Sequence, residues 1–218
     1  MKGGEQMEAK EILKRSYQLN APFEIREGEN GTKILTGKPI VFNQRTDMYW
    51  FEEVIERGAL NGTDLSDVRF LVNHDTSKIP LARHRASEPN STMSLKIEDD
   101  GLSVTIVLDV ENNNEARALY SAVLRGDISG MSFMFSIADE EWENLDSDYP
   151  TRRIKSIAVV FEVSAVTFPA YEGTEISARN KDDLENAKEI LNSAKEKEPK
   201  PEKRDFKTAA LIRMYTKK

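Results

Sequence analysis

The sequence of 218 residues contains no cysteine and only two histidines, His74 and His84. Without cysteine the chain cannot form disulfide bonds, use a thiolate as a nucleophile or build a cysteine zinc site. This composition fits a reducing compartment. The two imidazoles are left as the side chains that ordinarily change charge near neutral pH.

The sequence also lacks any apolar run near the ~20 residues that a membrane-spanning helix needs. Its opening segment, MKGGEQMEAKEILKRSY, carries charges of both signs and has no apolar stretch like that of a secretory signal. With 39% hydrophobic and 32% charged residues, the chain is typical of a soluble globular protein. We expect it to stay in the cytoplasm of the cell that makes it.

An excess of positive charge is missing too. The formal net charge is −7 and the isoelectric point is near 5.1, which argues against a general affinity for nucleic acid or for an anionic membrane. The length suits one domain with tails, since single domains commonly reach ~100 to 200 residues. We expect an N-terminal arm at 1–21, a body at 22–179 and a charged helical appendage at 180–218.

The body reads mainly as β-structure, because short alternating runs of polar and apolar residues are separated by turn signals. Asn30-Gly31 predicts one hairpin turn and Asp100-Gly101 predicts another. The acidic stretch 138–150 reads as a solvated loop, followed by a long β-branched central strand. The strands that we expect run over 22–28, 32–37, 38–44, 67–75, 92–110, 128–137 and 152–168.

Helical patterns are fewer. Residues 47–60 read as a short helix with Asp47 as its N-cap, and the segment 112–127 as a helix that begins at an asparagine cap and stops at Gly126. Residues 1–20 read as a weak helix or a frayed arm. In the appendage, a seam about two heptads long predicts a helix that docks on the body or binds a partner helix. The seam consists of Leu184, Ala187, Leu191 and Ala194.

His74 is a candidate general base. It ends the predicted strand 67–75, where alternation would place it on the apolar face of Val68, Phe70 and Val72. A shielded but reachable imidazole, with an ordinary pKa of about 6.5, can take and return a proton at neutral pH. A purely structural role is the alternative, and the residue alone leaves it open.

Ser132 is a candidate nucleophile. It lies in ISGMSFMFS (128–136) between two bulky side chains, Met131 and Phe133, and shares a face with Gly130. Because glycine has no side chain, a substrate backbone could approach there, and the serine would face a cleft. Met134 stands where the G-x-S-x-G elbow of α/β hydrolases has its second glycine, which excludes that motif. An ordinary hydrogen-bonded hydroxyl is the alternative.

Glu162 is the only charged residue in IAVVFEVSAV (157–166). A buried carboxylate without a partner costs several kcal/mol, so we expect a partner for it. One interpretation is an arginine ion pair, and the other is a catalytic imidazole that the carboxylate orients. The sequence leaves both open. The available arginines are Arg83, Arg117, Arg125, Arg152 and Arg153.

Several blocks occur together in a fixed order: RGAL (57–60), FLVNHD (70–75), PLARH (80–84), LRGDISGMSFMF (124–135) and FEVSAVTFPAYEGT (161–174). This set resembles the prohead (capsid maturation) proteases of tailed bacteriophages over about residues 22–179. Those enzymes in turn resemble the herpesvirus assemblin proteases. The resemblance implies an α+β, mainly β fold, in which a few helices surround a closed antiparallel β-barrel.

The resemblance also implies the roles of the candidate residues. Ser132 would be the nucleophile and His74 its base. The matching block offers Glu162 as the third member, whereas the herpesvirus enzymes use a second histidine, for which His84 is the remaining candidate. We favour Glu162. Such acyl transfer needs no metal and no cofactor.

The implied function is that of a serine endopeptidase inside the immature capsid, the prohead, in the host cytoplasm. It would cut the scaffold protein or the delta region of the major capsid protein, and then its own charged ends. Self-association is expected, but no nucleic-acid or membrane partner. Two alternatives are a non-catalytic assembly or scaffold-fused module of the same fold, and a hydrolase with a Ser-Lys dyad that uses Lys155.

Overall fold

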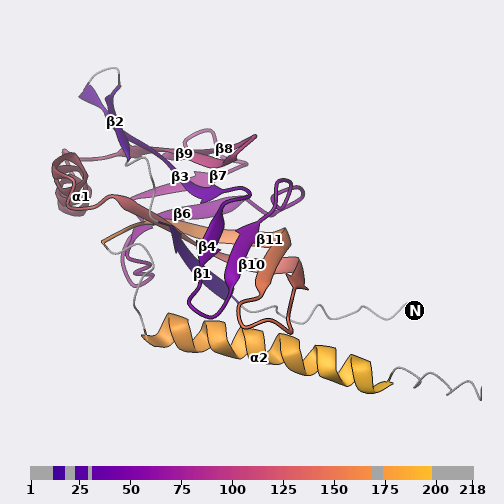
Figure 1. Cartoon of the computed structure of the whole chain (residues 1–218). Coiled ribbons are helices and arrows are strands. Elements are labelled where there is room, and N and C mark those ends of the chain that lie inside the picture. The colour runs from indigo at the N-terminus through magenta and orange to yellow at the C-terminus, as the bar shows by residue number, and fades with distance from the viewer. Residues whose placement is uncertain (1–11, 18–22, 29–30, 168–173, 198–218) are drawn as a thin grey trace, which may run out of the picture.

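The computed structural model describes residues 12–17, 23–28, 31–167 and 174–197. Within these ranges the chain forms eleven strands, arranged in two hydrogen-bonded sheets, and two α-helices (Figure 1). Neither of the two helices described is long and apolar enough to cross a bilayer. Apolar side chains from both sheets pack into one core. The two sheets therefore belong to a single folded body.

The larger sheet is built around one long strand. Its hydrogen-bonded order is β1 (Ile12–Tyr17), β10 (Gly130–Glu143), β11 (Thr151–Val166), β5 (Glu52–Ile55) and β4 (Arg45–Asp47). In addition, β6 (Asp67–Val72) pairs with β11, and β7 (Ala82–Arg85) pairs with β6. β11 is antiparallel to β10 but parallel to β5 and β6. The expectation of a central strand at this place is confirmed.

The smaller sheet is antiparallel throughout. Its order is β2 (Glu24–Glu27), β3 (Lys33–Val41), β9 (Gly101–Leu108) and β8 (Met93–Glu98). Both predicted hairpins are confirmed, since β2 pairs with β3 and β8 pairs with β9. Gly101 suits the second turn because a Cβ at this position would collide with the backbone oxygen of Ile40.

The expectation of a closed antiparallel barrel is wrong. Both sheets are open: the larger begins with β1 and ends with β4, and the smaller begins with β2 and ends with β8. Closure requires a continuous ring of paired strands with a fixed stagger, whereas the described strands fall into two separate hydrogen-bonded sets, and two of the pairs are parallel. Alternation in a sequence identifies strands and their faces, but not which edges pair.

The prediction of a helix over 47–60 is also wrong. This segment contains the end of β4, then β5, followed by turns. Phe51, Val54 and Ile55 are all buried, because β5 lies inside the sheet, and a strand buried on both faces loses its period of two. Asp47 accepts a hydrogen bond from the backbone N of Tyr49 at 2.7 Å rather than capping a helix.

The helix predicted within 112–127 is confirmed as α1 (Asn114–Arg125). The side chain of Asn113 accepts hydrogen bonds from the backbone N of Glu115 and of Ala116, at 2.9 and 3.2 Å. Gly126 ends the helix in the left-handed conformation with φ 78°, which glycine adopts without steric cost. Both ends therefore follow the capping rules that the sequence displays.

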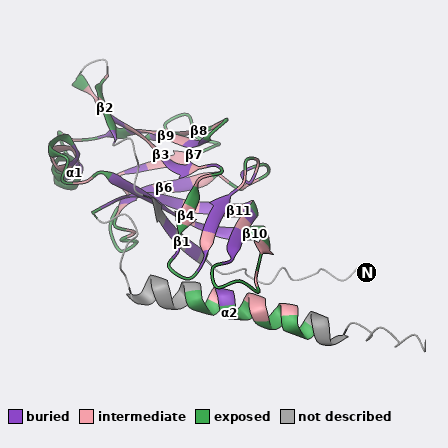
Figure 2. Cartoon of the chain, viewed as in Figure 1, coloured by how far each residue is buried: buried purple, intermediate pink, exposed green. Residues whose placement is uncertain are grey.

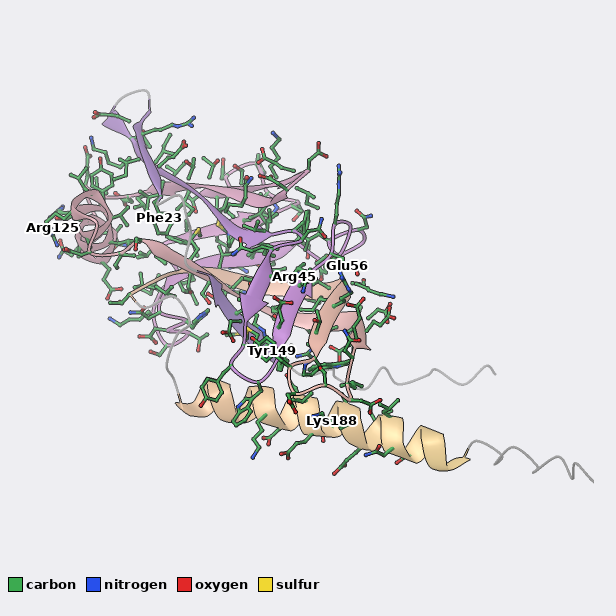
Figure 3. All side chains as sticks on the ribbon, viewed as in Figure 1. Phe23, Arg45, Glu56, Arg125, Tyr149 and Lys188 are labelled. Carbon is green, nitrogen blue, oxygen red and sulfur yellow. The ribbon has the colours of Figure 1, made fainter. Side chains whose placement is uncertain are left out.

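The acidic stretch is only partly a loop, because β10 continues to Glu143. Its carboxylates form ion pairs with basic side chains of the neighbouring strand β11. Glu140 pairs with Arg152 at 2.6 Å, Glu143 with Arg153 at 2.6 Å, and Glu141 with Lys155. Opposite charges on neighbouring strands stabilise a sheet. In the connection that follows, Tyr149 donates a hydrogen bond to Asp47 of β4 at 2.6 Å (Figure 3).

Helix α2 (Thr174–Lys197) begins before the predicted appendage at 180–218 and continues into it. Leu184 is buried in a small cluster with Met48 and Phe51, so this part of the seam docks on the body of the same chain. Ala187 and Leu191 line the same side of the helix beside a cavity, and the side chain of Ala194 lies outside the described residues. Figure 2 shows the described part of α2 as a mixture of exposed and intermediate positions around the buried Leu184.

The N-terminal arm differs from its expectation as well. Residues 12–17 form strand β1, which pairs antiparallel with β10, and not a weak helix. Leu13 and Arg15 are buried, so alternation places one face of this strand against the body. Residues 1–11 lie outside the described part, and the domain limits at 21 and 179 remain predictions.

Candidate active site

Among the described residues, eight polar or charged side chains are buried: Arg15, Glu53, Ser132, Ser136, Thr151, Arg152, Glu162 and Ser164. Burial of such groups is costly unless they find hydrogen-bond partners. Most of them belong to two hydrogen-bonded groups that meet at Ser132. One group contains His74, and the other contains the N-terminal strand.

Ser132 lies in the middle of the larger sheet. It is on β10, opposite Ser16 of β1 on one side and Ser164 of β11 on the other. Its exposure is 0%, so it does not face the open cleft that we expected, and its hydroxyl contacts the backbone of β1 instead. The serine hydroxyl is held by a rigid strand between two others, and its position is therefore well defined.

His74 is positioned by a turn and not by a strand face as predicted. β6 ends at Val72, and the next two residues, Asn73 and His74, have φ values of 52° and 58°. Asn73 fixes this left-handed turn: its backbone N donates to Ala165 O, and its side-chain oxygen accepts from Thr167 N, both at 2.9 Å. Non-glycine residues adopt this conformation rarely, and mostly where surrounding contacts hold them.

The structure brings the three predicted site residues together. The Oγ of Ser132 lies 2.5 Å from Nε2 of His74, and Nδ1 of His74 lies 2.5 Å from Oε1 of Glu162. The side chains of His74 and Glu162 are 13% and 3% exposed. A hydroxyl, an imidazole and a buried carboxylate in line can transfer a proton from the hydroxyl and stabilise the imidazolium that forms.

Ser164 is a part of this arrangement that the sequence reasoning missed. It lies two residues after Glu162 on β11, donates a hydrogen bond to Oε2 of Glu162, and accepts one from the backbone N of His74 at 3.2 Å. It therefore ties the carboxylate to the turn that carries the imidazole. The signal was available, because residues two apart on a strand share a face and the block FEVS contains both.

The alternative third member, His84, has a different environment. It lies on β7, where it pairs with Val68 of β6, and its Nδ1 lies 3.2 Å from the backbone oxygen of Met93. Lys155, the alternative dyad lysine, is exposed and pairs with Glu141. Neither contact involves Ser132.

The arginines considered as partners of Glu162 are engaged elsewhere. Arg152 and Arg153 bind carboxylates of β10. Arg83 binds Asp67, Arg125 binds Asp127, and Arg117 binds the backbone oxygens of Val110 and Glu111. The hydrogen bond from His74 therefore answers the question that the sequence left open about Glu162.

Two carboxylates have lowered pKa values: Asp75, next to His74 in the sequence, and Asp67, at the start of β6. The pKa of Asp75, which follows His74, is lowered mainly by a hydrogen bond from the hydroxyl of Ser77 and next by one from its backbone N–H. The pKa of Asp67 on β6 is lowered mainly by the hydrogen bond from Arg83. Both stay ionised at neutral pH. Within the described ranges, no group of three histidine or carboxylate residues could hold a metal ion.

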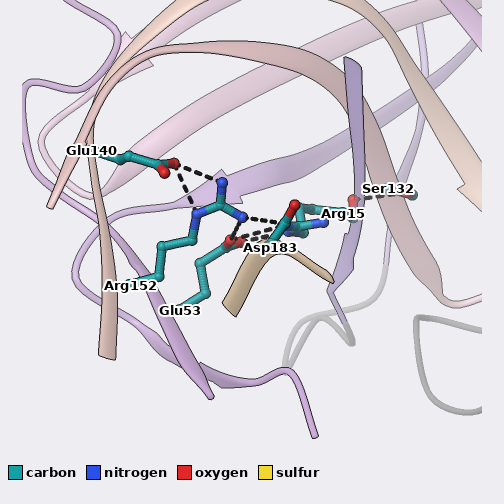
Figure 4. Close-up of polar contacts among 6 residues, drawn as sticks. All are labelled: Arg15, Glu53, Ser132, Glu140, Arg152 and Asp183. Atoms are coloured by element: carbon teal, nitrogen blue, oxygen red, sulfur yellow. Dashed lines mark hydrogen bonds and ion pairs between the residues drawn. The ribbon is translucent and has the colours of Figure 1, made fainter. Parts of the chain in front are cut away.

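Ser132 has a second partner. Its Oγ lies 2.7 Å from the backbone oxygen of Arg15, on β1 (Figure 4). A hydroxyl has one proton to donate, so the Arg15 carbonyl and Nε2 of His74 compete for it. The peptide group that joins Arg15 to Ser16 is therefore held beside the candidate nucleophile.

The comparisons with known proteins agree with this geometry. The family model described as caudovirus prohead serine protease matches residues 21–190. The chain belongs to this family. It is 29% identical over 170 residues to the prohead protease of Enterobacteria phage HK97, a match that covers 76% of this chain and 68% of that protein. It is thus a serine protease of the kind that acts in phage capsid assembly.

One solved structure is also similar to this protease, the capsid assembly protease gp21 of bacteriophage T4. The match covers 74% of this chain and 100% of that chain, with 12% sequence identity and a TM-score of 0.44.

Proposed function

We propose that the chain is the endopeptidase of capsid maturation, which cuts the scaffold protein or the delta region of the major capsid protein inside the prohead. Ser132 is the nucleophile, His74 the general base and Glu162 the residue that orients the imidazole. The observation that carries the proposal is the line of hydrogen bonds from Ser132 through His74 to Glu162, in a member of the prohead serine protease family.

The geometry supports a mechanism of acyl transfer. Nε2 of His74 takes the proton of Ser132 as Oγ attacks the scissile carbonyl carbon, and the imidazolium then gives this proton to the leaving amine. Water, activated by the same imidazole, hydrolyses the resulting ester and releases the new carboxylate. Throughout, Glu162 accepts a hydrogen bond from Nδ1 of His74 and favours the tautomer that leaves Nε2 free.

The protease also cuts its own N-terminal arm in this proposal. The support is strand β1, which lies on β10 as an extended peptide, with the Arg15 carbonyl oxygen 2.7 Å from Oγ of Ser132. In this resting arrangement the oxygen accepts a hydrogen bond from the nucleophile. For attack, the peptide group must turn so that its carbon faces Oγ. Residues 22–179 are the catalytic body, and release of the arm would open the site.

A direct test is co-expression with the capsid protein from the same phage, followed by mass spectrometry of the fragments. We expect defined cuts in the capsid or scaffold protein with the wild-type chain and none with Ser132→Ala. His84→Ala is the matched control, because His84 contacts the backbone oxygen of Met93, which is not part of this line of hydrogen bonds. Fragments that persist at the wild-type rate in Ser132→Ala would contradict the proposal. The absence of fragments with either chain would favour a non-catalytic assembly module.

A further inference from the structure

The side chain of Arg15 is buried, although its backbone lies at the candidate nucleophile. Its residue exposure is 4%, and its guanidinium forms two hydrogen bonds with Glu53 of β5. Nε lies 2.7 Å from Oε1 and Nη2 lies 2.9 Å from Oε2. Glu53 is itself only 1% exposed. This paired geometry matches the planar fork of a guanidinium and fits the single charge of a lysine less well.

The surroundings of Glu53 carry an excess of negative charge. Asp183 of α2 lies 3.9 Å from Nη2 of Arg15 and 2.7 Å from Nη1 of Arg152. Arg152 also binds Glu140 at 2.6 Å and lies 3.7 Å from Glu53 (Figure 4). With Arg15 in place, this cluster holds two guanidiniums and three carboxylates. Without it, three carboxylates would face one guanidinium, and Glu53 would lose its two hydrogen bonds.

The position of the Arg15 backbone connects the site around Glu53 with the candidate nucleophile. The residue whose carbonyl lies at a serine nucleophile is the one that precedes the scissile bond. Here that residue is Arg15, and its side chain ends at Glu53. Without an arginine here, Glu53 would lose both of its hydrogen bonds and keep only the longer ion pair with Arg152 at 3.7 Å, and a buried carboxylate with too little compensation is costly. A substrate that brings an arginine removes this cost, and one that brings a neutral side chain does not.

We propose that Glu53 determines the specificity of the protease and selects substrates with arginine immediately before the cut bond. The proposal rests on Ser132 as the nucleophile. The chain's own first substrate is then the bond between Arg15 and Ser16. Targets in the capsid or scaffold carry arginine at the corresponding position. Leu13, on the same face of β1 and buried beside a cavity of about 660 Å³, indicates that an apolar residue two positions earlier is favoured.

The test uses the full chain and peptides that span residues 9–20, with a fluorophore and a quencher at their ends. One peptide keeps arginine at position 15, a second has lysine, and a third has citrulline, which is the neutral counterpart of arginine with nearly the same shape. Mass spectrometry locates the cut. We expect kcat/KM to fall roughly tenfold with lysine and roughly a hundredfold or more with citrulline.

Variants at Glu53 test the same ion pair by changing the enzyme instead of the peptide. Glu53→Gln should reduce the preference for arginine over citrulline at least tenfold, and Glu53→Asp should retain most of it. Glu143→Gln is the matched control, because Glu143 lies on β10 and binds Arg153, outside this cluster. Glu143→Gln should keep the preference of the wild-type chain. Equal cleavage of the arginine and citrulline peptides by the wild-type chain would overturn the inference, even if Glu53→Gln failed to fold.

A phosphonate that reacts with activated serines separates this inference from the proposed function. If the phosphonate labels Ser132 and the wild-type chain cuts peptides after residues other than arginine, the specificity proposal is wrong and the catalytic proposal stands. If Ser132 is not labelled and no peptide is cut, the proposed function is wrong and the specificity proposal is wrong with it.

Discussion

Two buried carboxylates lie near Ser132, and their partners differ in kind. Glu162 binds the imidazole of His74, a side chain that can accept and donate a proton in catalysis. Glu53 binds the guanidinium of Arg15, which keeps its charge at any pH that a protein tolerates. The first pair is therefore suited to proton transfer, and the second is suited to recognition of a fixed charge.

The two pairs also differ in how the chain builds them. Glu162 and Ser164 lie on β11 and His74 on the turn after β6, a strand that pairs with β11. The second group joins β1, β5, β10, β11 and α2, and its members extend from Arg15 to Asp183 in the sequence. It also includes a strand that we propose is cut away. The proposed catalytic group of Ser132, His74 and Glu162 thus lies within the body, whereas the second group takes one of its five members, Arg15, from the arm.

The largest expected effect concerns the catalytic group. Ser132→Ala and His74→Ala should each lower the rate of peptide cleavage by roughly 10⁴-fold or more, and the double variant should be no slower, because members of a triad act as a unit. Stability in Ser132→Ala should change by less than ~1 kcal/mol. Steady-state kinetics and urea unfolding measure the two quantities. Additive losses in the double variant would show that the two residues act independently.

Glu162→Gln should cause the next largest loss of catalytic rate. An amide of the same size leaves the packing intact but no longer favours the tautomer with a free Nε2, so we expect kcat to fall roughly 10³-fold on every peptide. Glu53→Gln should instead lower the rate on arginine peptides far more than on citrulline peptides. The loss of rate in Glu162→Gln should thus be the same for every peptide, whereas the loss in Glu53→Gln should depend on the residue before the cut bond. If Glu162→Gln were silent and His84→Ala inactive, His84 would replace Glu162 as the third member.

The burial of Glu162 can be predicted from the sequence, whereas the burial of Glu53 cannot. Glu162 stands alone in an apolar strand, so its burial and its need for a partner can be predicted. Glu53 is one of two adjacent glutamates in a segment whose apolar spacing resembles a helix, and nothing local marks it as buried. Its partners also depend on which strands pair at the edge of the sheet. Alternation does not contain that information, and the incorrect prediction of a barrel has the same cause.

A third prediction concerns the appendage. Truncation after Arg179 removes Asp183 and Leu184, and it should lower the free energy of unfolding by about 2 to 4 kcal/mol, the usual cost of losing a buried leucine. We expect the shortened chain to keep cutting peptides at a temperature where it is folded, since the catalytic group lies before residue 179. Truncation after Lys197, which keeps both Asp183 and Leu184, is the control. Loss of activity in a folded chain cut after Arg179 would place α2 within the catalytic domain.

Ser164→Ala should have a smaller effect on catalysis. The variant removes the hydroxyl that ties Glu162 to the backbone of His74, so the imidazole is held less firmly and kcat should fall roughly tenfold, about 1.4 kcal/mol in the barrier. Ser136→Ala is the matched control, because Ser136 is also a buried serine of the same sheet but is not part of the catalytic group. Equal kinetics in the two variants would show that Ser164 has only a structural role.

The smallest effect is expected at Glu140, the more exposed of the two carboxylates that bind Arg152. Arg152 is bound by Glu140, whose side chain is 31% exposed, and by Asp183, whose side chain is 9% exposed. Exposed ion pairs contribute little because water screens them, whereas loss of a buried partner leaves a charge without compensation. Glu140→Gln should therefore change the free energy of unfolding by less than ~1 kcal/mol, and Asp183→Asn should cost clearly more. Urea unfolding at low and high salt measures both. If the two variants lost the same stability, the division of this cluster into a buried centre and a solvated rim would be wrong.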